Sequence, residues 1–401
     1  MNRLLFACLT LSLLTLATAQ ADSPPIYYGR WGATGTGPGQ FRGAHGVAVD
    51  PWGDVYAPDY NNHRIQKFDA LGTFIMTWGS EGTDTSHFEG PWAVATSKAG
   101  NIYVTELIGN RVQEFTRNGL YIRKWGSLGT GIGQFQMPSG IAISANGAVY
   151  VSERQNNRIQ EFDLNGNFIR AWGSAGFNDG QFNQPLDVAV GLDGSVYVAD
   201  VFNTRIQKFD STGTFVAKWD WSAIGYPNGI AVDPQGNLLV TDAINARVVK
   251  LDPANGNVLT TFGSSGNAPG QFMSIEKVAA SPSGFIYVSD SELNFISLFA
   301  PAGVSAPPSA ANPGGFFLFG SVPNPVRGAA KIRFDLSTPA PVTVGIYDIS
   351  GRLVRLVCEN VMETAGPHEL PWDAHGLAAG IYQVLVRSGS FSSAKKVIVL
   401  E

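Results

Sequence analysis

Short segments in which apolar and polar residues alternate run through most of the chain, separated by Gly, Asn and Asp. This alternation is typical of β-strands, because successive side chains point to opposite faces of a sheet. The first complete set comprises residues 46–50, 54–59, 64–69 and 74–80. The pattern predicts a unit of four short strands joined by turns.

The four-strand unit recurs, and two independent markers follow it. An arginine-centred segment recurs at steps of 47 residues and finally 42 residues, at Arg64, Arg111, Arg158, Arg205 and Arg247. An aromatic residue recurs at steps of 47 residues and finally 43 residues, at Trp78, Trp125, Trp172, Trp219 and Phe262. Four strands in about 45 residues is the size of one β-propeller blade. The sequence therefore predicts an all-β fold built from blades.

The repeated segments resemble the NHL repeat family. The likeness is carried by NNHRIQKF (residues 61–68), IGNRVQEF, QNNRIQEF, FNTRIQKF and INARVVKL. It covers roughly residues 25–303, although the sixth unit has Phe295 in place of the arginine. The resemblance implies a propeller domain over residues 25–303.

The two ends of this region are complementary. The sixth unit ends after its third strand, at Ile296–Phe299, and has no Trp-Gly strand of its own. The segment IYYGRWG, residues 26–32, aligns with Phe74–Gly79 and supplies the missing strand. We therefore predict that the N-terminal segment completes the last blade and closes a ring of six blades.

A charged pair recurs in the blades. An acidic residue ends each second strand, and an arginine follows five residues later, so each turn brackets opposite charges. The pairs are Asp59 and Arg64, Glu106 and Arg111, Glu153 and Arg158, Asp200 and Arg205, and Asp242 and Arg247. A ring of ligand-binding charges is the alternative, but recurrence in nearly every blade favours a structural role.

Positions that differ between blades are better candidates for function, because a propeller binds ligands through loops around its channel. Aligning the starts of the innermost strands and the residues after the second-strand acids gives one rim. Its candidate residues are His45, Tyr60, Trp92, Ser139, Arg154, Asp187, Asn228 and Glu276. This mixture of aromatic, polar and charged groups suits a protein, peptide or glycan ligand. The alternative is a merely solvated surface.

An enzymatic role is the competing hypothesis, since six-bladed relatives include hydrolases and lyases. His45 resembles a zinc ligand of the peptide α-amidating lyase family, but the equivalent positions hold Trp, Ser, Leu, Asn and Glu. A catalytic zinc site needs three protein ligands. We expect no metal, no cofactor and no catalytic residue. The alternative is a secreted metal-dependent lyase or lactonase with a metal near His45 and Glu276.

Composition and the N-terminus indicate export. The 401 residues carry a net charge of −5, which argues against nucleic acid as a partner. Residues 1–19 have the form of a signal peptide, with Arg3, an apolar run and the cleavage site Ala17-Thr18-Ala19. Since no other apolar stretch is long enough to span a membrane, we expect no transmembrane span in the mature chain.

A second domain follows the propeller. Residues 304–317 are rich in Pro and small residues and indicate a linker. Residues 318–401 alternate in short strands, which predicts a small immunoglobulin-like β-sandwich. Their segments PNP (323–325) and IYDISGRLV (346–354) resemble both the C-terminal sorting domain of the type IX secretion system and the FlgD-like immunoglobulin-like domain.

The sorting resemblance implies export through the periplasm of a Gram-negative-type bacterium. It also implies outer-membrane secretion machinery as a partner, and a final location at the cell surface or in the medium. A plain structural spacer is the alternative role of this domain. Together, the patterns predict an exported, non-catalytic binding or scaffold protein whose propeller rim contacts its ligand.

Overall fold

The computed structural model describes residues 23–220, 225–301, 316–322, 324–336, 339–348, 351–364, 366–388 and 391–400. Their regular structure is almost entirely β-strand, with two short 3-10 helices, η1 (Tyr60–Asn62) and η2 (Val201–Asn203). The predicted signal peptide and most of the predicted linker lie outside the described residues. None of the helices in these ranges has the length and apolar character needed to cross a membrane.

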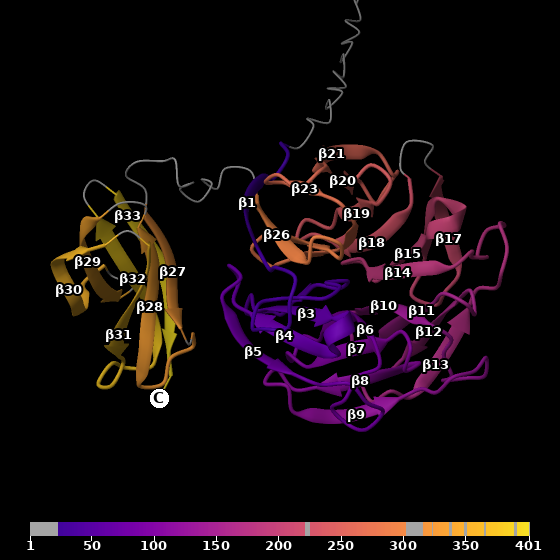
Figure 1. Ribbon diagram of the computed structural model, residues 1–401, viewed down its shortest axis with the longest axis horizontal. Coiled ribbons are helices and arrows are strands. Elements are labelled where there is room, and N and C mark those ends of the chain that lie inside the picture. Colours follow the sequence, from indigo (N-terminus) through magenta and orange to yellow (C-terminus); the bar gives the residue numbers. More distant parts are fainter. Residues whose placement is uncertain are drawn as a thin grey trace, which may run out of the picture.

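The described part of residues 26–300 forms six four-stranded sheets, and we call each sheet a blade (Figure 1). Blade 1 contains β2 (Ala48–Val49), β3 (Val55–Asp59), β4 (Arg64–Phe68) and β5 (Phe74–Trp78). Blade 2 contains β6 (Pro91–Thr96), β7 (Ile102–Glu106), β8 (Arg111–Phe115) and β9 (Tyr121–Trp125). Blade 3 contains β10 (Pro138–Ile143), β11 (Val149–Glu153), β12 (Arg158–Phe162) and β13 (Phe168–Trp172).

The remaining blades follow the same plan. Blade 4 contains β14 (Pro185–Val190), β15 (Val196–Asp200), β16 (Arg205–Phe209) and β17 (Phe215–Asp220). Blade 5 contains β18 (Pro227–Val232), β19 (Leu238–Asp242), β20 (Arg247–Leu251) and β21 (Val258–Phe262). Blade 6 combines β24 (Ile275–Ala280), β25 (Ile286–Asp290) and β26 (Phe295–Ala300) with β1 (Ile26–Trp31). A short parallel pair, β22 (Ser264–Ser265) and β23 (Gln271–Phe272), precedes β24.

The blades form a closed ring. The innermost strands contact one another in the order β2, β6, β10, β14, β18, β24 and β2 again. β1 pairs antiparallel with β26, so that Tyr27 lies opposite Phe299 and Trp31 lies opposite Ile296. This confirms the predicted closure by the N-terminal segment. Because both ends of the domain share one sheet, blade 6 has four strands, as its neighbours do.

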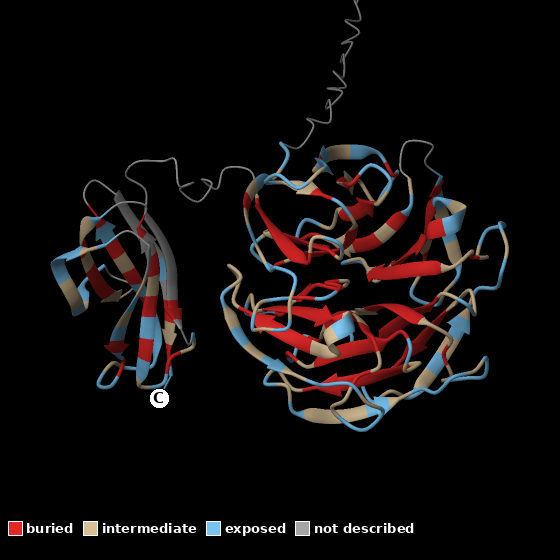
Figure 2. Cartoon of the chain, in the orientation of Figure 1, coloured by how far each residue is buried: buried red, intermediate tan, exposed pale blue. Residues whose placement is uncertain are grey.

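Packing between blades explains the recurring aromatic residues. The inner and middle strands are buried, whereas the outermost strands alternate between partial and full exposure (Figure 2). Phe88 packs against the glycine that follows Trp78, and a Cβ on Gly79 would lie 2.5 Å from its ring. Gly79 also has a φ of +100°, which favours glycine. In the repeat, the glycine of the Trp-Gly element therefore packs against the phenylalanine of the Gln-Phe element.

The C-terminal region contains two further sheets in the described residues. One contains β27 (Phe316–Val322), β28 (Ala329–Leu336) and β31 (Gly366–Asp373). The other contains β29 (Ala340–Asp348), β30 (Leu353–Glu363), β32 (Gly380–Ser388) and β33 (Phe391–Val399). Their buried faces share one core that includes Phe334, Val344 and Val384. The sequence did not indicate β27, which begins within the predicted linker, and the immunoglobulin-like topology stays a prediction.

Candidate functional site

The recurring charged pairs lie within the blades. Each arginine Nε is 2.5 to 3.0 Å from a carboxylate oxygen of its acid, in the pairs Arg64–Asp59, Arg111–Glu106, Arg158–Glu153, Arg205–Asp200 and Arg247–Asp242. All five acids are fully buried. A buried carboxylate that is already bonded has no surface to offer a ligand.

Each pair also fixes the long loop that precedes its blade. Arg205 donates hydrogen bonds to the backbone oxygens of Phe177, Asn178 and Gln181 at 2.8 to 2.9 Å. Gln207 donates to the Gln181 oxygen at 2.7 Å and to Asp200 at 3.1 Å. Sequence reasoning missed the glutamine, although it recurs two residues after four of the arginines. These contacts hold a loop to a hairpin and require no external partner.

Three aromatic rings gather at one mouth of the channel, and we call His45, Tyr60 and Trp92 the aromatic cluster. His45 precedes β2, Tyr60 opens η1, and Trp92 lies at the start of β6. The His45 and Trp92 rings stack with centroids 4.0 Å apart. Tyr60 meets both edge-on, at 5.2 Å from His45 and 5.5 Å from Trp92. All three side chains are partly exposed, so the cluster forms a ring-lined wall at the mouth.

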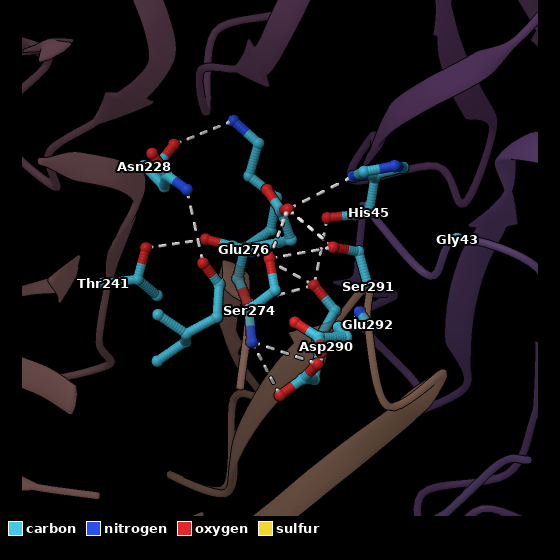
Figure 3. A network of polar contacts seen from close by, with 12 residues as sticks. Gly43, His45, Asn228, Thr241, Ser274, Glu276, Asp290, Ser291 and Glu292 are labelled. Atoms are coloured by element: carbon cyan, nitrogen blue, oxygen red, sulfur yellow. Dashed lines mark hydrogen bonds and ion pairs between the residues drawn. The ribbon is translucent and has the colours of Figure 1, made fainter. Parts of the chain in front are cut away.

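Glu276 joins this cluster to blade 6 (Figure 3). Its Oε1 accepts hydrogen bonds from the hydroxyl of Ser291 at 2.8 Å and from that of Ser274 at 3.4 Å. The same oxygen lies 3.4 Å from Nδ1 of His45. The Glu276 side chain keeps 11% of its surface exposed and that of His45 keeps 16%. A carboxylate therefore lies beside the aromatic wall, within reach of solvent.

Arg154 enters the same region from the end of β11 in blade 3. Its Nη2 donates to Oε1 of Gln184 at 3.4 Å, and its Nε is buried with no hydrogen-bond partner among the described residues. Burial lowers the pKa of the Arg154 guanidinium, and the charge of Glu276 opposes this by a smaller amount. Arg154 thus differs from the repeat arginines, which have carboxylate partners.

A buried ion pair links blade 6 to blade 4, past blade 5, beneath the mouth. Nζ of Lys277 in blade 6 lies 2.8 Å from Oδ1 of Asp187 in blade 4. Lys277 also donates to the backbone oxygens of Leu186 and Asn228, and Oδ2 of Asp187 accepts from the Ile230 N–H. Burial lowers the pKa of Lys277 and raises that of Asp187, while their mutual attraction acts against both shifts. Below this pair the channel is lined largely by apolar residues of the innermost strands.

The candidate rim residues are therefore not equivalent. His45, Tyr60 and Trp92 contact one another and Glu276 lies beside His45, while Asp187 and the Asn228 backbone meet at Lys277. Ser139 is fully buried, and its hydroxyl lies 3.3 Å from that of Ser152 and 3.4 Å from the Pro185 oxygen. Ser139 therefore has no exposed surface at the mouth. Lys277, which pairs with Asp187, is not among the candidate residues that the sequence indicated.

Comparisons with known proteins agree with the two-part fold. Residues 41–68, 135–162, 182–209 and 225–251 match the NHL repeat, and residues 322–400 match the secretion system C-terminal sorting domain. Over 49 residues the chain is 49% identical to the B-box type zinc finger protein ncl-1 of Caenorhabditis elegans. That segment is 12% of this chain and spans only 6% of the worm protein.

The solved structures that match the chain include two lyases. A streptogramin B lyase structure is 15% identical, with a TM-score of 0.50, over 70% of this chain and 99% of that one. Virginiamycin B lyase from Staphylococcus aureus is 18% identical, with a TM-score of 0.46, over 66% of this chain and 86% of that one. At 15% identity, the likeness to the streptogramin B lyase structure shows the fold alone. The chain therefore contains NHL repeats within a β-propeller and a type IX C-terminal sorting domain, and it is secreted or located at the cell surface.

Proposed function

We propose that this is a non-catalytic binding or scaffold protein, which contacts a protein, peptide or glycan at the channel mouth that carries the aromatic cluster. One observation carries the proposal. Residues that recur between blades are buried in paired contacts, whereas His45, Trp92, Glu276 and Arg154, which do not recur, gather around one opening. Non-recurring residues with solvent access are where a repeat fold acquires a specific ligand.

The composition of the mouth supports binding. The aromatic cluster offers flat apolar surface, Glu276 accepts hydrogen bonds, and Arg154 donates them. Binding sites typically combine an apolar wall with a few polar groups that fix orientation. Because the buried Asp187–Lys277 pair lies in the channel below, we expect the ligand to rest at the mouth rather than thread through the ring.

The C-terminal sorting domain supplies the context. It interacts with the type IX secretion machinery, so the propeller acts outside the cell or at its surface. The ligand must then be an extracellular or surface molecule. Under this proposal the sorting domain determines where the propeller is delivered, and the mouth determines what it binds.

Metal-dependent chemistry finds less support in the residues. His45 and Glu276 lie together, but the described residues contain no group of three His, Cys, Asp or Glu side chains placed to hold a metal ion. A catalytic zinc normally has three protein ligands. The side chains at the mouth therefore do not fit the metal centre of the alternative lyase or lactonase.

The binding proposal predicts that Trp92→Ala abolishes recognition. The test applies the mature protein and the variant to a combined glycan and peptide array. Loss of the Trp92 ring removes the stacking partner of His45 and one wall of the mouth, so we expect at least a tenfold loss of signal for every ligand. Truncating a central aromatic residue commonly costs about 2 kcal/mol or more of binding free energy.

Trp52→Ala is the matched control. Trp52 is 49% exposed and stacks on Arg117. The substitution therefore removes an indole without changing the aromatic cluster. The control should keep the wild-type array profile. A profile that Trp92→Ala leaves unchanged, or an array on which the wild-type protein binds nothing, contradicts the proposal.

A further inference from the structure

We infer that the ligand is an acidic glycan, in which a sugar acid of the uronate type occupies the mouth. This inference rests on the proposed function and names its ligand class. The sugar carboxylate binds Arg154, the sugar hydroxyls bind Glu276, and the apolar face of the sugar ring lies against the aromatic cluster.

The first contact follows from the incomplete bonding of Arg154. Arg205, a repeat arginine, has a carboxylate at 2.8 Å and three backbone oxygens at 2.8 to 2.9 Å. Within the described residues Arg154 has one contact, to Gln184 at 3.4 Å, and its Nε has none. The charge of Glu276 acts on Arg154 only from beyond ion-pair distance, and a part-buried cation without a directly bonded anion is costly. A planar guanidinium pairs best with a carboxylate, which it binds through two parallel hydrogen bonds.

Glu276 does not fill this role for Arg154. Its Oε1 is taken up by the hydroxyls of Ser291 and Ser274 and by the nearby Nδ1 of His45. An ionised carboxylate accepts hydrogen bonds and donates none. Groups of the ligand that face Glu276 must therefore be donors, while the group that faces Arg154 must be an acceptor and is best an anion. The ligand therefore carries both hydrogen-bond donors and an anionic acceptor.

The aromatic cluster favours a sugar over a peptide. Nδ1 of His45 and Nε1 of Trp92 are buried and lack hydrogen-bond partners among the described residues, the imidazole having only its long contact with Glu276. These two nitrogens are closed off from solvent, so a ligand at the mouth meets the partly exposed rings together with the Glu276 carboxylate and the Ser291 hydroxyl beside them. A hydroxyl both donates and accepts, and a sugar displays several around a compact ring with an apolar face. A peptide backbone offers one donor and one acceptor per residue.

The test is isothermal titration of the mature protein with trigalacturonate, with neutral galactotriose and with a short acidic peptide. We expect trigalacturonate to bind at least tenfold more tightly than either of the others, with an affinity that falls as salt is added. Arg154→Gln should bring the acidic and neutral sugars to within about threefold of each other, because it removes the guanidinium that distinguishes them.

Lys98→Gln is the matched control, since it removes one positive charge from an exposed residue at the opposite mouth of the channel. It should keep the preference for trigalacturonate. Arg154→Lys, which keeps the charge but loses the planar fork, should give an intermediate preference. The comparison of the three probes on wild-type protein needs no variant, so a poorly folded variant leaves the inference testable.

The outcomes separate the two proposals. Equal affinity for both sugars, with binding still lost in Trp92→Ala, overturns the acidic-glycan inference and leaves the proposed function standing. Tighter binding of the acidic peptide also overturns it. If none of the probes binds and the array is blank as well, the proposed function itself fails.

Discussion

Asp200 is a fully buried charged residue and Arg154 a partly buried one, and their surroundings differ. Asp200 accepts hydrogen bonds from the backbone N–H of Asn183, the side-chain amide of Asn203 and the guanidinium of Arg205. The Arg154 side chain has a single long hydrogen bond, to Gln184, among the described residues. The bonding of Asp200 is complete within the chain, so it needs no ligand, whereas we expect Arg154 to gain its partner on binding.

The environment of Asp200 gives a pH prediction. Burial raises the pKa of its carboxyl, although its hydrogen bonds and the charge of Arg205 oppose the shift. When the folded-state pKa exceeds that of the unfolded chain, the folded state holds its proton more tightly. The resulting stability is fully present below the unfolded-state pKa and is lost as the pH rises through the folded-state pKa.

We therefore predict that wild-type protein gains stability relative to Asp200→Asn as the pH falls from about 7 to about 4, a range that approaches the ordinary Asp pKa. Urea unfolding of both proteins across this range measures the difference, and the asparagine provides a reference that cannot titrate. A difference that stays constant, or that moves toward the variant on acidification, shows that the carboxyl pKa is not raised.

At the scale of the element, most strands could be predicted from the sequence because each carries its own alternation and ends at a turn residue. Predicted segments 54–59 and 64–69 correspond to β3 and β4 within one residue at each end. The predicted strand 46–50 is shorter in the structure, where β2 is Ala48–Val49. Its first residues approach the next blade closely, since a Cβ on Gly46 would lie 2.7 Å from the Trp92 oxygen. A close approach between blades leaves no mark in local alternation.

The pairing of β1 with β26 gives a prediction for ring closure. Deleting residues 20–31 removes β1, including the buried Tyr28, and exposes the edge of β26. We expect the melting temperature to fall by roughly 10 °C, because a loss of about 3 to 5 kcal/mol shifts it by about 2 to 4 °C per kcal/mol in a domain of this size. An open edge also promotes self-association.

Differential scanning calorimetry and size-exclusion chromatography measure both effects. The matched control deletes residues 20–22, which precede the strand. If the longer deletion melts at the same temperature as the control and stays monomeric, β1 does not close the ring.

At the scale of the whole molecule, the ring order predicted which residues would surround one opening, because a repeat aligns equivalent positions. It could not predict how the side chains are used there. Ser139 turns into the protein and is buried, while Lys277 reaches across to Asp187. These outcomes depend on side-chain direction and on contacts between residues of different blades. The contacting residues lie 43 or more positions apart in the sequence. Neither is encoded in the period of the repeat.

The whole chain combines a delivery signal with a binding surface. The sorting domain directs the protein to the cell surface or beyond it, and the propeller supplies a rigid ring on which non-recurring residues meet. Rigidity matters because the residues of the aromatic cluster and Glu276 come from three different blades. Their mutual distances are set by blade packing rather than by any single loop.

The central claim is that ligand binds where these residues converge. A crystal structure of the mature protein with the ligand selected on the array tests it most directly. The account predicts that the bound molecule contacts Trp92 and Glu276 at the mouth and leaves the repeat acids untouched. A ligand bound instead at the opposite mouth, which is lined by Asp50, Lys98 and Asp233, or on the outermost strands of the blades, would contradict it.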